Sequence, residues 1–271
     1  MSIQYRRPPI TFELAARSTL FFIGQATATV IFGPMLVVSV LLPHRLRFAI
    51  VLRWTYFNMW WLRVTCSLNH VVEGRDNIPD KPAIVLSKHQ SAWETIALQC
   101  YFAPQVWVLK RELLLVPFFG WGLAILRPIA IDRRTGNDAI AQILEQGNQR
   151  LEEGCWVVVF PEGTRVPPGG KRRYKLGGAK LASETGAQVV PVAHNAGLYW
   201  PRNSFIKYPG TITLAIGPPI DSRGKSAAEI NQLAEIWIET TAARLLPEPE
   251  TEQPTDVGPD APKPEGMEKT C

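Results

Sequence analysis

Short apolar runs alternate with helix-like segments over most of the chain after residue 70. Several runs, such as residues 156–160, are apolar at every position, which is typical of strands buried on both faces. The runs that predict strands are residues 70–73, 82–87, 105–110, 128–132, 155–160, 188–193 and 211–216.

Two longer segments between or after these runs predict helices. Residues 137–153 place apolar side chains on one helical face and end at Gly154. Residues 226–246 open with Ser226-x-x-Glu229, the pattern of a capping box. The alternation predicts that residues 70–246 form an α/β domain with a mixed, largely parallel sheet flanked by helices. Ligands of such sheets bind beyond the carboxyl ends of the strands.

The first 69 residues follow a different pattern. No Asp or Glu lies between Glu13 and Glu73, and residues 18–43 form a run of 26 positions without a formal charge. About 20 apolar residues span a bilayer, and Pro34 would kink a helix here. The next segment mixes Arg with Trp and Tyr, which favour the headgroup level. We therefore predict that residues 1–69 form a membrane-embedded helical hairpin, with one kinked hydrophobic helix and one basic amphipathic helix. The alternatives are a buried hairpin of a soluble core and a secretory signal peptide.

Composition and charge divide the chain further. The 271 residues include 29 Lys and Arg against 24 Asp and Glu, a net charge of +5. Residues 247–271 hold seven acids, two bases and six prolines, and we predict that this tail is disordered. The rest of the chain is therefore strongly basic and should meet an anionic partner. Nucleic acid is disfavoured, because the bases of the first 69 residues lie among apolar residues.

Cysteine and histidine spacing gives no sign of a metal site. The four Cys form no C-x-x-C pair and the four His lie in different segments. We predict that the cysteines are free thiols in a reducing compartment.

Charged and polar side chains follow four of the predicted strands. His89 and Glu94 follow the second strand, and Arg133 follows the fourth. Basic residues at the end of the third strand are Lys110 and Arg111, and the strand that ends at Phe160 is followed by Glu162, Gly163, Thr164 and Arg165. This set suits a general base beside a phosphate-bearing substrate.

The pair His89 and Glu94 has three interpretations. If Ser91 is the N-cap, Glu94 lies in the first helical turn and can fold back to orient the imidazole as a general base. Alternatively, Ser91-x-x-Glu94 is only a capping box. A serine hydrolase with Ser87 or Ser91 as nucleophile is disfavoured, because no G-x-S-x-G elbow surrounds either residue.

The order of the segments resembles the four blocks of the glycerolipid acyltransferases. The blocks are His89 with an acid five positions later, residues 110–120, residues 160–165 and Val190-Pro191-Val192. The resemblance covers about residues 70–220. It implies that His89 is the general base, with Glu94 in the place of the usual Asp. It also implies a substrate-binding set of Lys110, Arg111, Arg133, Glu162, Gly163, Thr164 and Arg165, in which Arg165 with Lys110 or Arg111 holds a phosphate. Val166 replaces the frequent Ser after this Arg.

The same resemblance implies an activity and its partners. The family transfers an acyl group from acyl-CoA or acyl carrier protein, as co-substrate, to the sn-2 hydroxyl of a lysophosphatidate and needs no cofactor. Membrane lipids are the implied partners, and the implied location is the inner membrane with the active site facing the cytoplasm. Two alternatives stay open: another lysolipid acceptor, such as a lyso-ornithine lipid, and a non-catalytic lipid-binding membrane protein.

Overall fold

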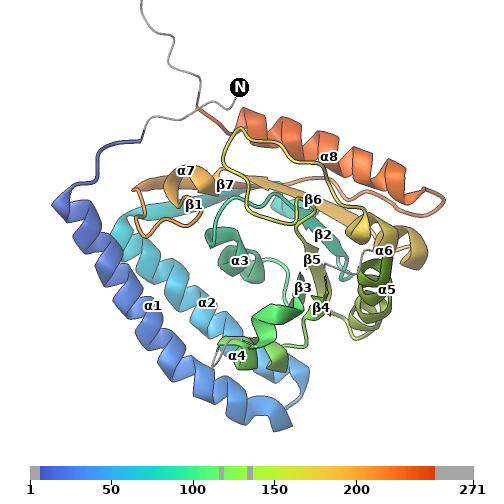
Figure 1. Ribbon diagram of the computed structural model, residues 1–271, viewed down its shortest axis with the longest axis horizontal. Helices are drawn as coiled ribbons and strands as arrows, with labels where there is room; N and C mark the ends of the chain where they lie inside the picture. The colour runs from blue at the N-terminus through green and yellow to red at the C-terminus, as the bar shows by residue number, and fades with distance from the viewer. Residues whose placement is uncertain (1–6, 116–118, 133–136, 248–271) are drawn as a thin grey trace, which may run out of the picture.

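A seven-stranded sheet lies at the centre of the part of the chain that the structure describes (Figure 1). The computed structural model describes residues 7–115, 119–132 and 137–247. The strands are β1 Leu68–Glu73, β2 Ile84–Ser87, β3 Gln105–Lys110, β4 Ile129–Ile131, β5 Trp156–Val159, β6 Val189–His194 and β7 Gly210–Ile216. Their order is β1-β7-β6-β2-β5-β3-β4, and only β6 and β7 pair antiparallel. The predicted mixed, largely parallel α/β sheet is confirmed.

Helices cover both faces of this sheet (Figure 1). One face packs against α5 Asn137–Glu152, α6 Gly177–Thr185 and α8 Ala227–Arg244, and the other against α2 His44–Cys66 and α3 Trp93–Ala97. Helix α1, Phe12–Val38, lies along α2, and the short helices are α4 Phe119–Ile125 and α7 Ala196–Tyr199. Single 3₁₀ turns occupy Ser39–Leu41, Arg75–Asn77, Leu98–Cys100 and Arg111–Leu115.

The continuous apolar runs follow from this double coverage. In β2, Ile84 and Leu86 belong to the core beneath α5, α6 and α8, whereas Val85 belongs to the core beneath α2 and α3. Successive side chains of a strand point to opposite faces, so every position of such a strand is buried. The capping box at the start of α8 is also present, with Ser226 and Glu229 bonding each other's backbone N–H.

Helices α1 and α2 form an antiparallel hairpin along one side of the molecule (Figure 1). The indole N–H of Trp61 in α2 donates to the carbonyl of Leu20 in α1 at 3.1 Å. Residues Phe12–Leu41 are long and apolar enough to cross a membrane, by length and composition alone, and only 17% of their most apolar stretch is buried. The helical hairpin is confirmed, and its insertion in a membrane stays a prediction.

Other predictions are not tested by the structure. Residues 248–271 and Arg133 lie outside the described residues, and the division at residues 69 and 246 stays a prediction. Among the described cysteines, Cys66, Cys100 and Cys155 are not in disulfides.

Candidate active site

His89 lies in the loop after β2, and its imidazole contacts the carboxylate of Glu94. The distance from Nδ1 of His89 to Oε1 of Glu94 is 2.7 Å. The same oxygen accepts the backbone N–H groups of Gln90 at 2.9 Å and Ser91 at 2.8 Å. One carboxylate therefore holds the loop before α3 and the imidazole as well. The N-cap of α3 is Ala92 rather than the predicted Ser91, and it makes no side-chain cap hydrogen bond, so the capping box is not complete. Because an ionised carboxylate only accepts, Nδ1 carries the proton and Nε2 is left to accept one.

Glu94 is fully buried, yet the structure favours its ionised form. Burial alone would raise its pKa, but the hydrogen bonds from the His89 ring and the Ser91 N–H hold the pKa below its ordinary value. His194 donates from Nε2 to the Lys88 carbonyl at 2.9 Å, and its Nδ1 accepts the backbone N–H of Ala196. His194 is therefore neutral, in line with the lowering of its pKa by burial. We accordingly regard the three N–H donors to Oε1 as the decisive cause.

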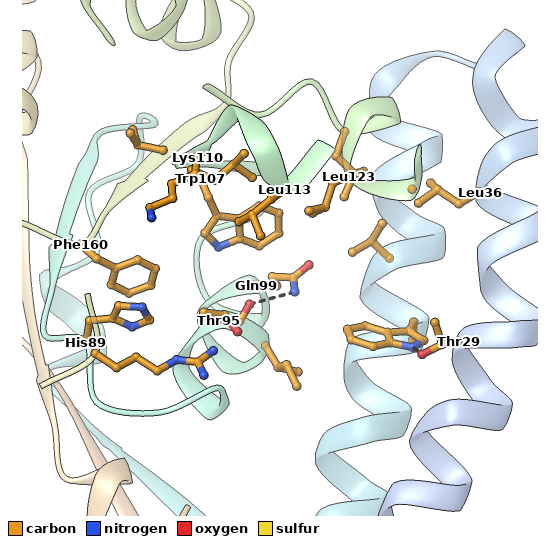
Figure 2. A pocket seen from close by; sticks show the side chains of 18 of the residues that line it. Thr29, Leu36, His89, Thr95, Gln99, Trp107, Lys110, Leu113, Leu123 and Phe160 are labelled. Atoms are coloured by element: carbon orange, nitrogen blue, oxygen red, sulfur yellow. Dashed lines mark hydrogen bonds between the residues drawn. The ribbon is translucent and has the colours of Figure 1, made fainter. Parts of the chain in front are cut away.

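Two residues of the β5 segment fix His89 from other directions. The ring of Phe160 stacks on the imidazole with centroids 4.1 Å apart and an interplanar angle of 17° (Figure 2). Glu162 accepts the backbone N–H of His89 at 2.8 Å through Oε2 and the ammonium of Lys88 at 2.7 Å through Oε1. Burial raises the pKa of Glu162 despite this partner. The ring edge, the ring face and the backbone of His89 each have a contact.

His89 opens onto a cavity of about 830 Å³ with two unlike ends. Strand ends and loops supply the polar part, which comprises His89, Lys110, Gly163, Thr164, Arg165 and Arg202. Helices α1, α2 and α4 with β3 supply an apolar wall, which includes Phe32, Leu36, Val51, Trp54, Trp107, Leu123 and Leu126. Figure 2 shows Lys110 above the stacked His89 and Phe160, with Leu123 and Leu36 on the far side. The cavity suits an anionic headgroup that carries an apolar chain.

Several known proteins have sequences similar to that of this chain. An acyltransferase family model matches residues 69–195. A 1-acyl-sn-glycerol-3-phosphate acyltransferase of Pseudomonas aeruginosa is 45% identical over 238 residues, which cover 86% of this chain and 93% of that protein. The chain belongs to the acyltransferase family. It is therefore an enzyme.

Two further proteins are similar to this chain. The acyltransferase shares 34% identity over 139 residues with a 1-acyl-sn-glycerol-3-phosphate acyltransferase of Borreliella burgdorferi, covering 51% of this chain and 54% of that protein. The crystal structure of the 1-acyl-sn-glycerophosphate acyltransferase PlsC from Thermotoga maritima superposes with a TM-score of 0.72, covering 86% of this chain and 95% of that chain. At 24% identity this second likeness shows the fold alone.

The acyltransferase brings most of the predicted site residues together. Lys110, Gly163, Thr164 and Arg165 line the cavity with His89, although their roles stay predictions. Glu162 does not line it, because its carboxylate is turned inward to Lys88 and His89. Arg111 is exposed and also lies outside the lining.

Sequence reasoning missed Arg202, which belongs to the loop after α7. Arg202 lines the cavity, and its Nη1 donates to the carbonyl of Arg165 at 3.0 Å. No motif surrounds it, so only the folded chain identifies it. Across the residues that the structure describes, no group of three or more His, Cys, Asp or Glu side chains is placed to hold a metal ion.

Proposed function

We propose that this acyltransferase transfers an acyl group from a thioester donor to the sn-2 hydroxyl of 1-acyl-glycerol-3-phosphate, giving phosphatidate. The observation that carries the proposal is the position of His89, between a cationic end and an apolar wall of one cavity. The names of the Pseudomonas and Borreliella relatives describe the same acceptor.

His89 acts as the general base in this reaction. Its Nε2 takes the proton of the acceptor hydroxyl while the hydroxyl oxygen forms a bond to the thioester carbonyl carbon. The tetrahedral intermediate then expels the thiolate, which takes the proton from the imidazolium. Glu94 stabilises this imidazolium through the Nδ1–H bond and keeps the ring in the productive tautomer.

The acceptor lies across the two parts of the cavity. Arg165, Arg202 and Lys110 hold its phosphate, since guanidinium groups offer paired donors to phosphate oxygens. Its acyl chain lies against the apolar wall of α1, α2 and α4. A lysophosphatidate needs both the cationic side chains and the apolar wall, whereas an acceptor without a phosphate would use only the apolar wall.

The α1–α2 hairpin holds the enzyme in the membrane that contains its acceptor. The large apolar side chains exposed on α1 and the adjoining turn include Phe12, Phe22, Ile23, Val30, Ile31, Val38 and Leu41. Water contact at so many apolar side chains is unfavourable, and lipid would remove it. We place the enzyme in the inner membrane with its active site toward the cytoplasm, where acyl-CoA and acyl carrier protein are available.

The experiment is an acyl-transfer assay with the purified full chain, given acyl-CoA or acyl carrier protein as donor. The acceptors are 1-acyl-glycerol-3-phosphate, the matched 1-acyl-glycerol without phosphate, and a lyso-ornithine lipid. Transfer to the phosphate-bearing acceptor should dominate, and His89→Ala should lower kcat by about 10²- to 10⁴-fold. Preference for either of the other acceptors would overturn the proposed acceptor, and an active His89→Ala variant would overturn the mechanism.

A further inference from the structure

Lys88, the residue before the proposed base, lies at the centre of a buried polar cluster. Its side chain is 1% exposed. The ammonium bonds Oε1 of Glu162 at 2.7 Å, Oε1 of Glu239 at 2.7 Å and the carbonyl of Gly170 at 3.3 Å. An ammonium has three N–H donors, so every donor has an acceptor. A buried charge without such partners would be strongly destabilising.

Glu239 reaches this cluster from α8, 151 positions along the chain from Lys88. The Tyr174 hydroxyl donates to the same Oε1 of Glu239 at 2.9 Å. Burial first, and then the nearby carboxylates, raise the pKa of Tyr174, so the phenol keeps its proton and remains a donor. Polar contacts therefore run without a break from α8 through Lys88 and Glu162 to the backbone N–H of His89.

Charge balance does not explain the second carboxylate. Glu162 alone neutralises Lys88, and Glu239 leaves the cluster with two carboxylates for one ammonium. The three acceptors around the Lys88 ammonium do explain why it has a fixed position. Three acceptors from three segments of the chain hold Nζ, whereas one carboxylate would leave the ammonium free to rotate about it. Lys88 and His89 are consecutive, so fixing the first constrains the second.

We propose that Glu239 of α8 is a positioning residue for His89, acting through the ammonium of Lys88. The inference rests on the proposed function, because its effect on rate passes through His89 as the base. A displacement of about 1 Å at a reacting group lowers rates by up to about 10²-fold. The two hydrogen-bond partners of Glu239 are Lys88 and Tyr174, and neither lines the cavity. Substrate affinity should therefore not depend on Glu239.

The test compares Glu239→Gln with Glu235→Gln in the full chain under the acyl-transfer assay. Both variants remove one carboxylate from α8 at positions one turn apart. Glu235 makes no hydrogen bond or ion pair within the described ranges, whereas Glu239 bonds Lys88 and Tyr174. Glu239→Gln should lower kcat about tenfold or more with each KM within about twofold, and Glu235→Gln should match the wild type.

Each outcome decides the inference. Wild-type kcat in a folded Glu239→Gln protein overturns it, and so does an equal loss in Glu235→Gln, which would indicate a general effect of charge on α8. If Glu239→Gln does not fold, Tyr174→Phe carries the test, since it removes only the hydroxyl bonded to Glu239 and should lower kcat in the same direction. His89→Ala is assayed alongside. An active His89→Ala overturns the proposed function, whereas an inactive one beside a normal Glu239→Gln overturns this inference alone.

Discussion

At the scale of single residues, Glu94 contacts both the imidazole of His89 and the backbone before α3. Its Oε1 accepts the His89 Nδ1–H and also the N–H groups of Gln90 and Ser91. The predicted contact of the pair is present, whereas the predicted capping box is not complete, because Ala92 is the N-cap of α3 and no side chain caps it. The sequence predicts this contact, since the two residues are five positions apart. It does not predict His194 or Arg202, whose contacts are with residues 106 and 37 positions away.

The charge of Glu94 should matter for catalysis. Glu94→Gln keeps the side-chain length and one acceptor oxygen but cannot stabilise an imidazolium. We expect kcat to fall by about 10²- to 10⁴-fold, since the imidazole loses its preferred tautomer. Unchanged steady-state kinetics would leave Glu94 with a structural role alone, as the acceptor for the backbone N–H groups of Gln90 and Ser91.

The same substitution has an expected effect on stability. The pKa of Glu94 lies below its ordinary value of 4.5 in the folded chain. Its ionised form therefore stabilises the fold above that value, and the contribution is lost as pH falls through the folded pKa. The difference in unfolding midpoint between wild type and Glu94→Gln should shrink between about pH 6 and about pH 3.

Arg202 should act with Arg165 on the acceptor phosphate. Hydrogen bonds to charged groups contribute roughly 1.5–3 kcal/mol, so Arg202→Ala should raise the KM for 1-acyl-glycerol-3-phosphate by about 10- to 150-fold. The KM for the acyl donor should change much less. Arg223→Ala is the control, since Arg223 is exposed and its side chain bonds only Asp221 among the residues that the structure describes. A larger effect of Arg202→Ala on the donor KM would assign Arg202 to the donor instead.

At the scale of elements, the strands are the best-predicted part of the fold. All seven predicted runs are strands. In β2, β5 and β6 every position is buried, which leaves a continuous apolar signal that needs no knowledge of neighbours, whereas the edge strand β1 is only partly buried. Strand order and the antiparallel β6–β7 pair depend on contacts between distant segments, so local pattern cannot supply them. The same limit applies to the close packing of α1 on α2.

Two glycines of α1 should respond oppositely to alanine. A Cβ at Gly24 would overlap the indole of Trp61, whereas a Cβ at Gly33 would meet nothing within 4 Å. Gly24→Ala should destabilise the protein by about 1–3 kcal/mol through overpacking of the hairpin. Gly33→Ala should stabilise it by roughly 0.5–1 kcal/mol, because alanine is the better helix former. Thermal unfolding of both variants in one detergent measures the difference, and a stabilising Gly24→Ala would contradict the packing described.

At the scale of the whole molecule, the cavity beside His89 lies between the hairpin and the α/β sheet. Its lining runs from Thr29 in α1 to Asn203 after α7. The sequence predicted the polar half apart from Arg202, because motifs at strand ends mark it. The apolar half comes from helices that sequence reasoning assigned only to anchoring, so their contribution to the site was not predicted.

Membrane attachment should survive high salt. Apolar burial of α1 should dominate, because about 1 M salt shortens the Debye length to about 3 Å and screens the Arg residues from anionic lipid. Membranes washed with high salt or carbonate should keep the full chain in the pellet, as immunoblotting would detect. Release by salt alone would show that electrostatic attraction holds the protein and that α1 is not embedded.

The two-part lining of the cavity also bears on how the enzyme should behave in detergent. A detergent, like a lysolipid, has a polar head on an alkyl chain. The head suits the polar part of the cavity, and the chain suits its apolar wall. Detergent should therefore compete with the proposed lysolipid acceptor for this cavity, and detergents with anionic heads should compete best. The apparent KM for a lysolipid should therefore depend on the detergent as well as on the protein.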